Sequence, residues 1–173
     1  MRQPDFGPVM QMAWVVNDLE ASMRRWIEEQ GAGPFFVMRH CPVTNVRYRG
    51  TPATVDMDVA MAQSGGVQVE LIQQHDDLPS CYRDMYRKGE EGFHHVCYVV
   101  DDLPGALAHF ARIGQPPAIE GNFGSVSFAY VDSRPGIGCM TELVGRHPDI
   151  EAFFRKVADA AVDWDGRDPI RYL

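Results

Sequence analysis

The chain has 173 residues, about the length of one domain, and its hydrophobic fraction of 45% and charged fraction of 23% are those of an ordinary globular protein. Its 24 acidic and 16 basic side chains give a formal net charge of −8. This charge argues against nucleic acid as a partner, because phosphate binding needs a basic surface. No segment approaches the ~20 apolar residues of a membrane span. The four cysteines are scattered without a Cys-x-x-Cys spacing, which predicts free thiols and a cytoplasmic location.

The first predicted elements are a strand over residues 11–16 and a helix that begins after Asp18. β-branched and aromatic residues run into this aspartate, a pattern typical of a strand followed by a helix cap. Apolar residues from Leu19 to Ile27 then recur at the spacing of one helical face. Strand-like sequence returns over residues 35–38, 54–61 and 67–72.

The same order of elements returns in the second half of the chain. Residues 95–103 resemble residues 11–19, and a helical stripe from Leu103 to Ala111 follows. Strand-like sequence then covers residues 118–120, 125–131 and 139–144. A helical connector over about residues 79–90 is predicted between the halves. Asp149 is expected to cap a terminal helix, with a short polar tail after it.

The repeat predicts an α+β fold in one domain over residues 1–146. Two βαβββ modules, at about residues 8–78 and 92–146, are expected to form a curved mixed sheet around a cleft. Residues 147–173 are expected to add a C-terminal helix and tail.

The register of the repeat indicates where chemistry could occur. Side chains alternate across a strand, so equivalent positions in the two modules lie on equivalent faces. Gln11 is equivalent to His95 at the start of each first strand, and Glu70 is equivalent to Glu142 in each last strand. Two carboxylates, an imidazole and an amide oxygen that converge would suit a divalent metal in an open site: Zn, Ni, Co, Mn, Mg or Fe.

Each of these residues also has a structural interpretation. Gln11 alone is better read as a hydrogen-bonded strand end, and His95 alone as a core histidine. The glutamates lie between apolar neighbours, where a charge is costly without a partner, and this favours a functional role. His94 is predicted on the opposite face from His95, with a structural role, whereas Cys97 is predicted in the pocket wall.

Arg47 and Arg49 beside Tyr48 could hold a phosphate or a carboxylate, or could belong to a solvated loop. His40, His75, His109 and His147 have no matched partner in the repeat. We therefore expect these four histidines on the surface.

The duplicated strand-helix-three-strand unit, with Gln or His opening the first strand and Glu in the last, resembles the vicinal oxygen chelate superfamily over residues 9–146. That superfamily includes glyoxalase I, methylmalonyl-CoA epimerase, extradiol dioxygenases and bleomycin-resistance proteins. Residues 93–102 are similar to the opening of the second module in methylmalonyl-CoA epimerases, and residues 31–36 also resemble that branch. The set Gln11, Glu70, His95 and Glu142 is similar to the metal ligands of some glyoxalase I enzymes.

Other positions depart from the known members. Val15 stands where glyoxalase I would offer an arginine to glutathione, and Arg25-Trp26 replaces its Phe-Tyr pair. Both departures argue against a glutathione substrate. An Fe(II) ring-cleaving dioxygenase needs two histidines and one carboxylate, but His95 is the only matched histidine.

The resemblance and the ligand set together predict a metal-dependent enzyme that abstracts a proton next to a carbonyl. The metal would polarise the carbonyl oxygen, and Glu142 or Glu70 would act as the base. The expected reaction is epimerisation or isomerisation of a small carbonyl substrate, with an acyl-CoA thioester as one candidate, in a homodimer. The alternatives are a glyoxalase I-like lyase and a metal-free binding or resistance protein of the same fold.

Overall fold

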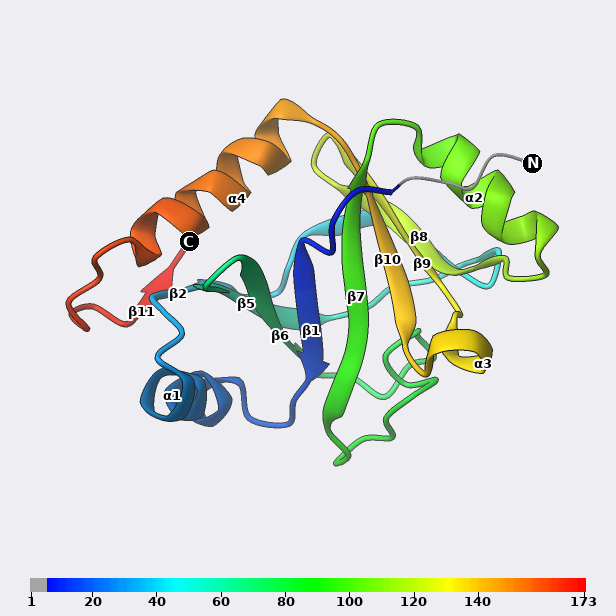
Figure 1. Ribbon diagram of the computed structural model, residues 1–173. Helices are drawn as coiled ribbons and strands as arrows, with labels where there is room; N and C mark the ends of the chain where they lie inside the picture. Colours follow the sequence, from blue (N-terminus) through cyan, green and yellow to red (C-terminus); the bar gives the residue numbers. More distant parts are fainter. Residues whose placement is uncertain (1–5) are drawn as a thin grey trace.

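The computed structural model describes residues 6–173 and contains two copies of the βαβββ unit (Figure 1). The elements of the first copy are β1 (Gln11–Val15), α1 (Leu19–Gln30), β2 (Phe35–Met38), β5 (Met57–Ser64) and β6 (Val67–Gln74). Those of the second copy are β7 (Gly92–Val100), α2 (Leu103–Arg112), β8 (Pro117–Phe123), β9 (Val126–Val131) and β10 (Met140–Gly145). The α+β fold with two such modules is therefore present.

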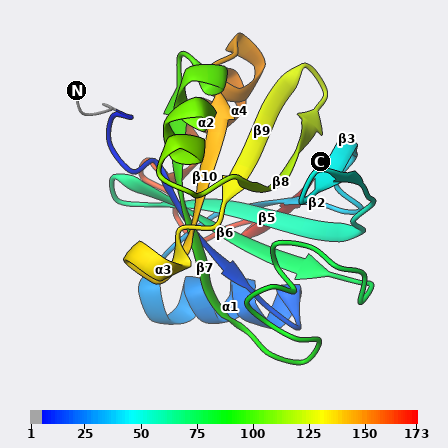
Figure 2. The same cartoon turned by 90° about the vertical axis from the view of Figure 1, so that its right-hand side faces the viewer.

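One curved, unclosed sheet runs through both modules in the order β11-β2-β5-β6-β1-β7-β10-β9-β8-β3-β4 (Figure 2). The two first strands, β1 and β7, pair antiparallel at its centre. Each first strand pairs parallel with the last strand of its own module, β1 with β6 and β7 with β10. The four strands predicted to carry the site are thus neighbours within a single chain.

Helices α1 and α2 cover the sheet on the face that does not carry the site. Leu19 and Met23 of α1 pack against Leu71 of β6, and Phe110 of α2 packs against Leu143 of β10. Because strand side chains alternate, the neighbours of these leucines in β6 and β10 point to the opposite face. The predicted site residues in these strands are such neighbours.

Within residues 6–173, three strands lie outside the βαβββ units: β3 (Val43–Tyr48), β4 (Thr51–Pro52) and β11 (Ile170–Tyr172). The β3–β4 hairpin leaves the first module and pairs with β8 of the second. The C-terminal β11 pairs parallel with β2 at the other end of the sheet. The hairpin was not predicted, because its alternation is broken at Asn45, whose φ of 53° is left-handed.

The predicted helical connector over residues 79–90 is wrong, since this segment forms turns between β6 and β7. Ser80, Cys81 and Tyr82 are buried in succession, a pattern that a single helical face against the core cannot produce. Backbone bonds such as Asp84 N–H to the Ser80 carbonyl form only isolated turns.

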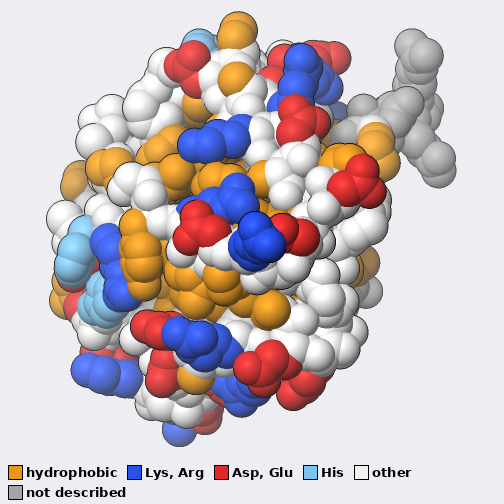
Figure 3. Space-filling model, turned by 90° about the vertical axis from the view of Figure 1, so that its left-hand side faces the viewer, with side chains coloured by type: hydrophobic (Ala, Val, Ile, Leu, Met, Phe, Trp, Pro, Cys, Tyr) orange, Lys and Arg blue, Asp and Glu red, His pale blue; other side chains and the backbone are white. Residues whose placement is uncertain are grey.

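The last helices are α3 (Arg134–Ile137) and α4 (Pro148–Ala161). The N-cap of α4 is His147, whose Nδ1 accepts the backbone N–H of Asp149, so the predicted cap at Asp149 is two residues late. Figure 3 views the side that carries α4 and β11 and shows hydrophobic side chains with basic side chains over them. The Nζ atom of Lys156 in α4 lies 5.2 Å from the centre of the Phe36 ring, and the Cζ atom of Arg171 in β11 lies 5.6 Å from it. Among the described residues, the helices are too short or too polar to cross a membrane.

Candidate metal centre

The predicted ligands lie on the central strands of the sheet. Ala13 of β1 pairs in register with Glu70 of β6 on one side and with His95 of β7 on the other. The Ala13 side chain is a single methyl group, so the two longer side chains can approach each other over it. Glu142 of β10 is opposite Cys97 of β7, two residues beyond His95, and completes the group.

The structure brings Glu70, His95 and Glu142 together. His95 Nε2 is 3.3 Å from Glu70 Oε2 and 3.2 Å from Glu142 Oε2. One potential ligand atom from each of the three lies within 4.8 Å of those of the others. All three side chains are buried, so each carboxylate depends on this cluster for its stabilisation.

Gln11 borders the same cavity as Glu70 and Glu142. Its amide Nε2 donates to Gln68 Oε1 at 2.6 Å, so the Gln11 Oε1 atom is the one free to turn toward a metal. The hydrogen bond agrees with the structural interpretation of Gln11, and the shared cavity keeps it a candidate fourth ligand.

His94 contacts His95 instead of lying on the opposite face. Between β1 and β7 the pairing passes from Ala13–His95 to Trp14–Phe93, so His94 is the extra residue of a β-bulge. The bulge breaks the alternation and turns the two rings together, with 2.9 Å between their Nδ1 atoms. Alternation alone therefore gave the wrong position for His94.

The contacts of His94 determine which nitrogen of His95 faces the glutamates. His94 Nε2 lies 3.1 Å from the carbonyl oxygen of Cys81 and must donate to it. Burial and the neighbouring His95 lower the pKa of His94 to about 3, so its ring is neutral near pH 7. Its Nδ1 is then an acceptor and takes the Nδ1–H of His95. Nε2 of His95 is left to face the two carboxylates.

The ionisable groups of the cluster perturb one another. Burial lowers the pKa of His95, but the carboxylates of Glu142 and Glu70 outweigh burial and raise this pKa to about 9. Burial raises the pKa of Glu70. Burial acts in the same direction on Glu142, but the interaction with His95 outweighs it and lowers the Glu142 pKa.

The donor set fits a divalent cation. His95 Nε2 and Glu70 Oε2 are both buried and lie 3.3 Å apart, but neither makes a well-aligned hydrogen bond in the described part of the chain. Buried polar atoms without partners are rare and costly, and an ion held between them would satisfy both. One imidazole and two carboxylates, with the Gln11 amide nearby, suit Zn and the other first-row divalent metals.

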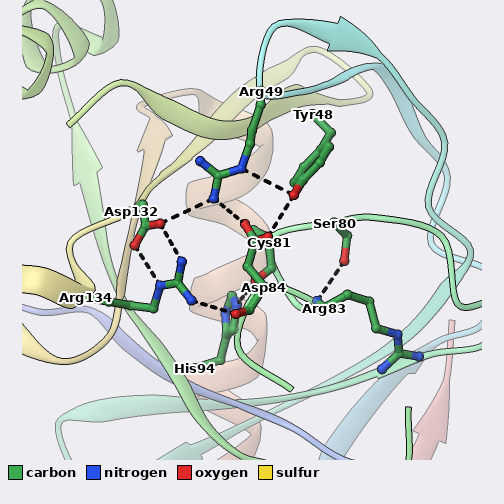
Figure 4. Close-up of polar contacts among 9 residues, drawn as sticks. All are labelled: Tyr48, Arg49, Ser80, Cys81, Arg83, Asp84, His94, Asp132 and Arg134. Atoms are coloured by element: carbon green, nitrogen blue, oxygen red, sulfur yellow. Dashed lines mark hydrogen bonds and ion pairs between the residues drawn. The ribbon is translucent and has the colours of Figure 1, made fainter. Parts of the chain in front are cut away.

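A polar network next to the 81–84 turn includes Arg49, one of the two arginines considered either for anion binding or for a solvated loop (Figure 4). Arg49 Nη2 lies 2.7 Å from Asp84 Oδ2 and 3.3 Å from Asp132 Oδ2. Arg134 also bonds Asp132 and donates to the carbonyl oxygen of Asp84 at 2.6 Å. Arg49 is therefore already neutralised, and its contacts hold the 81–84 turn that carries the carbonyl bonded by His94.

Two other predictions also change with the structure. Arg47 lies in strand β3 rather than in a solvated loop, and its guanidinium donates to the carbonyl oxygen of Gly50 between β3 and β4. Cys97 is fully buried but is absent from the residues that line the cavity, so it is not the predicted pocket wall.

Another cluster was missed by the sequence interpretation. His40, Asp58 and His75 offer ligand atoms that lie within 4.8 Å of one another. Asp58 is fully buried; its Oδ1 accepts the His40 backbone N–H, and its Oδ2 accepts from Arg39 at 2.6 Å. These bonds pin a turn in which His40 has a left-handed φ of 46°. The repeat could not reveal this cluster, because the second module has no equivalent of it.

The sequence is similar to that of a known protein family. The sequence profile of the glyoxalase/bleomycin resistance protein/dioxygenase superfamily matches residues 10–130, more than half of the chain. The chain belongs to this superfamily. The match covers β1 to β9 and so includes Gln11, Glu70 and His95. No curated protein sequence is significantly similar to the chain.

Solved structures agree on the fold. Methylmalonyl-CoA epimerase from Mycobacterium tuberculosis is similar with a TM-score of 0.54 at 13% identity, over 83% of this chain and 90% of that one. A variant of the Streptomyces coelicolor methylmalonyl-CoA epimerase, in complex with 2-nitronate-propionyl-CoA, gives 0.51 at 16% identity, over 82% and 95%. A hypothetical protein from Bacillus halodurans C-125 gives 0.53 at 12% identity, over 81% and 94%. At these identities the likeness establishes the fold alone.

Proposed function

We propose that the chain is a metal-dependent enzyme that removes a proton next to a carbonyl group, as an epimerase or isomerase. The observation that supports this most is the convergence of Glu70, His95 and Glu142 on one buried point that borders a cavity. A divalent ion bound there would supply Lewis-acid polarisation of the substrate carbonyl. Membership in a superfamily that includes enzymes is consistent with the proposal.

The two glutamates supply the base. Each borders the cavity, and each comes from the last strand of a different module. One glutamate, as a carboxylate, can remove the proton, and the other, as a carboxylic acid, can return a proton to the opposite face, so that the α-carbon is inverted. Metal-bound carboxylates are weak bases, so the base must be the glutamate that is less tightly held.

Deuterium wash-in tests the proposal. The enzyme, loaded with a divalent metal, is incubated in deuterated water with a series of carbonyl compounds that includes acyl thioesters. Exchange at the α-carbon is followed by nuclear magnetic resonance. We expect exchange that depends on metal and is lost in Glu142→Gln or Glu70→Gln, while the exposed Glu29→Gln serves as the control.

The variants that lose deuterium exchange distinguish the possible functions of the site. Loss in one glutamine variant with metal content kept identifies the base. Exchange accompanied by cleavage of a carbon–sulfur bond would favour a glyoxalase-like lyase. Ligand binding in the cavity without exchange in any protein would contradict the proposal and favour the binding protein, a class that the apolar cavity wall also suits.

A further inference from the structure

The cavity at the metal centre has no basic side chain in its wall, although an enzyme that acts on an anion would be expected to offer one. Glu70 and Glu142 are the only charged side chains among the described residues that line it. The walls are apolar: Met57, Val59 and Met61 of β5 on one side, and Phe128 of β9 on the other.

The remaining polar groups of the wall are neutral near pH 7. Burial raises the pKa of the Cys41 thiol to about 12. The Tyr82 and Tyr130 hydroxyls and the Gln11 amide cannot carry a positive charge. A divalent ion on Glu70 and Glu142 would balance their two charges, which leaves no net positive charge for a second anion. A substrate carboxylate would therefore lose its hydration in the cavity without gaining a cationic partner.

Helix α4 contributes to the wall of the cavity. Ile150, Phe153 and Phe154 of this helix form part of the lining. The cavity volume is about 80 Å³. This is roughly half that of a ~150 Å³ cavity that holds a benzene molecule, so the cavity accommodates only a short alkyl chain.

We propose that this cavity binds a short, uncharged alkyl group of the substrate, attached to the reacting carbonyl, and that Phe153 sets the maximum length of that group. The proposal rests on the proposed function, because it takes the metal centre as the position of the carbonyl. It excludes substrates that place a carboxylate in this cavity. The rest of the substrate lies outside the cavity and is not restricted by it.

Binding of simple ketones to the metal-loaded protein tests this directly. Straight-chain methyl ketones from butanone to 2-octanone are titrated into protein carrying ¹³C-methyl methionine. Met38, Met57 and Met61 line the cavity and report occupancy, whereas Met12 and Met23 lie outside it. We expect affinity to increase about fourfold for each methylene until the cavity is full, and then to stop increasing.

Two variants test whether Phe153 sets the maximum length of the bound alkyl group. Phe153→Ala should let the increase continue for longer ketones, because it removes the ring at the α4 wall. Phe93→Ala is the matched control: Phe93 is half-buried like Phe153 but packs against Trp14, outside the cavity. The same length limit in all three proteins would overturn the role of Phe153.

Charge is tested with an isosteric pair, 5-methyl-2-hexanone and 4-oxopentanoate, which differ in a terminal isopropyl group and a carboxylate. We expect the acid to bind at least about tenfold more weakly. Met61→Lys, at a half-buried wall position, should reduce or reverse this preference. Equal or tighter binding of the acid to the wild type, or failure of every ketone to shift the cavity methionines, would overturn the proposal.

These binding results do not depend on turnover. If ketones bind as expected but no compound exchanges deuterium, the proposed function fails and the cavity assignment stands. If exchange occurs only with substrates that place an anion in the cavity, the proposed function stands and this inference fails.

Discussion

At the scale of single residues, the orientation of His95 depends on its neighbour His94, which contacts no other predicted metal ligand. The Cys81 carbonyl and His94 form a relay that directs Nε2 of His95 toward the glutamates. Such indirect partners fix the tautomer and ring position of a metal-binding histidine. His94 is therefore a positioning residue for His95 in the proposed metal centre.

Replacing His94 tests that role. His94→Gln keeps a polar side chain but cannot reproduce a rigid acceptor opposite His95 Nδ1. We expect metal affinity to decrease by about 10–100-fold with a folded protein. Competition with a chromophoric chelator measures the affinity, and His109→Gln on α2 is the control. Unchanged affinity in His94→Gln would show that His95 is oriented by packing alone.

Asp58 is a buried carboxylate, and it therefore also needs hydrogen-bond partners. Burial acts to raise its pKa, but bonds from His75, the His40 backbone and Arg39 outweigh burial and lower it. A carboxylate with a lowered folded-state pKa stabilises the fold above its unfolded pKa of about 3.9, and this contribution is lost as pH falls through the folded-state value.

We therefore expect Asp58→Asn to reduce the free energy of unfolding by about 1–3 kcal/mol at neutral pH, because the His40 backbone N–H, His75 and the half-exposed Arg39 lose a buried carboxylate partner. The difference from wild type should shrink below about pH 4, where Asp58 of the unfolded wild type begins to protonate, and should be lost as pH falls through the lower folded-state pKa. Urea unfolding at several pH values measures both effects. Asp56→Asn, which removes a half-exposed carboxylate, should cost less than about 1 kcal/mol. Equal costs for the two variants would contradict this account of Asp58.

At the scale of elements, periodicity predicted the segments that obey a simple local rule. The strands and helices of both modules were predictable because each has one apolar face and a recognisable cap, as with Asp18 before α1. Glu70, His95 and Glu142 could be grouped because their register recurs in both modules. The β3–β4 hairpin, the turns after β6 and the bulge at His94 depend on contacts between distant segments, which local patterns do not contain.

The tail after α4 illustrates such a distant contact. A Cβ atom at Gly33 would lie 2.5 Å from the Trp164 ring, so this ring packs directly on the backbone before β2. Gly33→Ala should displace Trp164 and lower the free energy of unfolding by about 1–3 kcal/mol. Tryptophan fluorescence and thermal unfolding detect the change. Gly66→Ala, with open space around its Cβ, should be nearly silent, and a silent Gly33→Ala would contradict the close packing.

At the scale of the whole molecule, duplication places one glutamate from each module beside a single imidazole. The antiparallel pairing of β1 and β7 puts β6 and β10 on either side of the central strands, so both carboxylates reach the same point within one chain. Helices α1 and α2 cover the opposite face, which leaves the site face for the cavity and α4. The same duplication places two carboxylates against one imidazole, and a bound divalent cation would balance both carboxylate charges.

The metal content of the purified chain tests the central claim most directly. Protein is prepared without chelator, loaded with a divalent metal, and desalted before inductively coupled plasma mass spectrometry. We predict a single tightly held ion per chain in the wild type and in His109→Ala. We predict loss of that ion in His95→Ala with the fold retained by circular dichroism. A wild type that retains no ion, or a His95→Ala variant that retains as much as wild type, would contradict the assignment of Glu70, His95 and Glu142 as a metal centre.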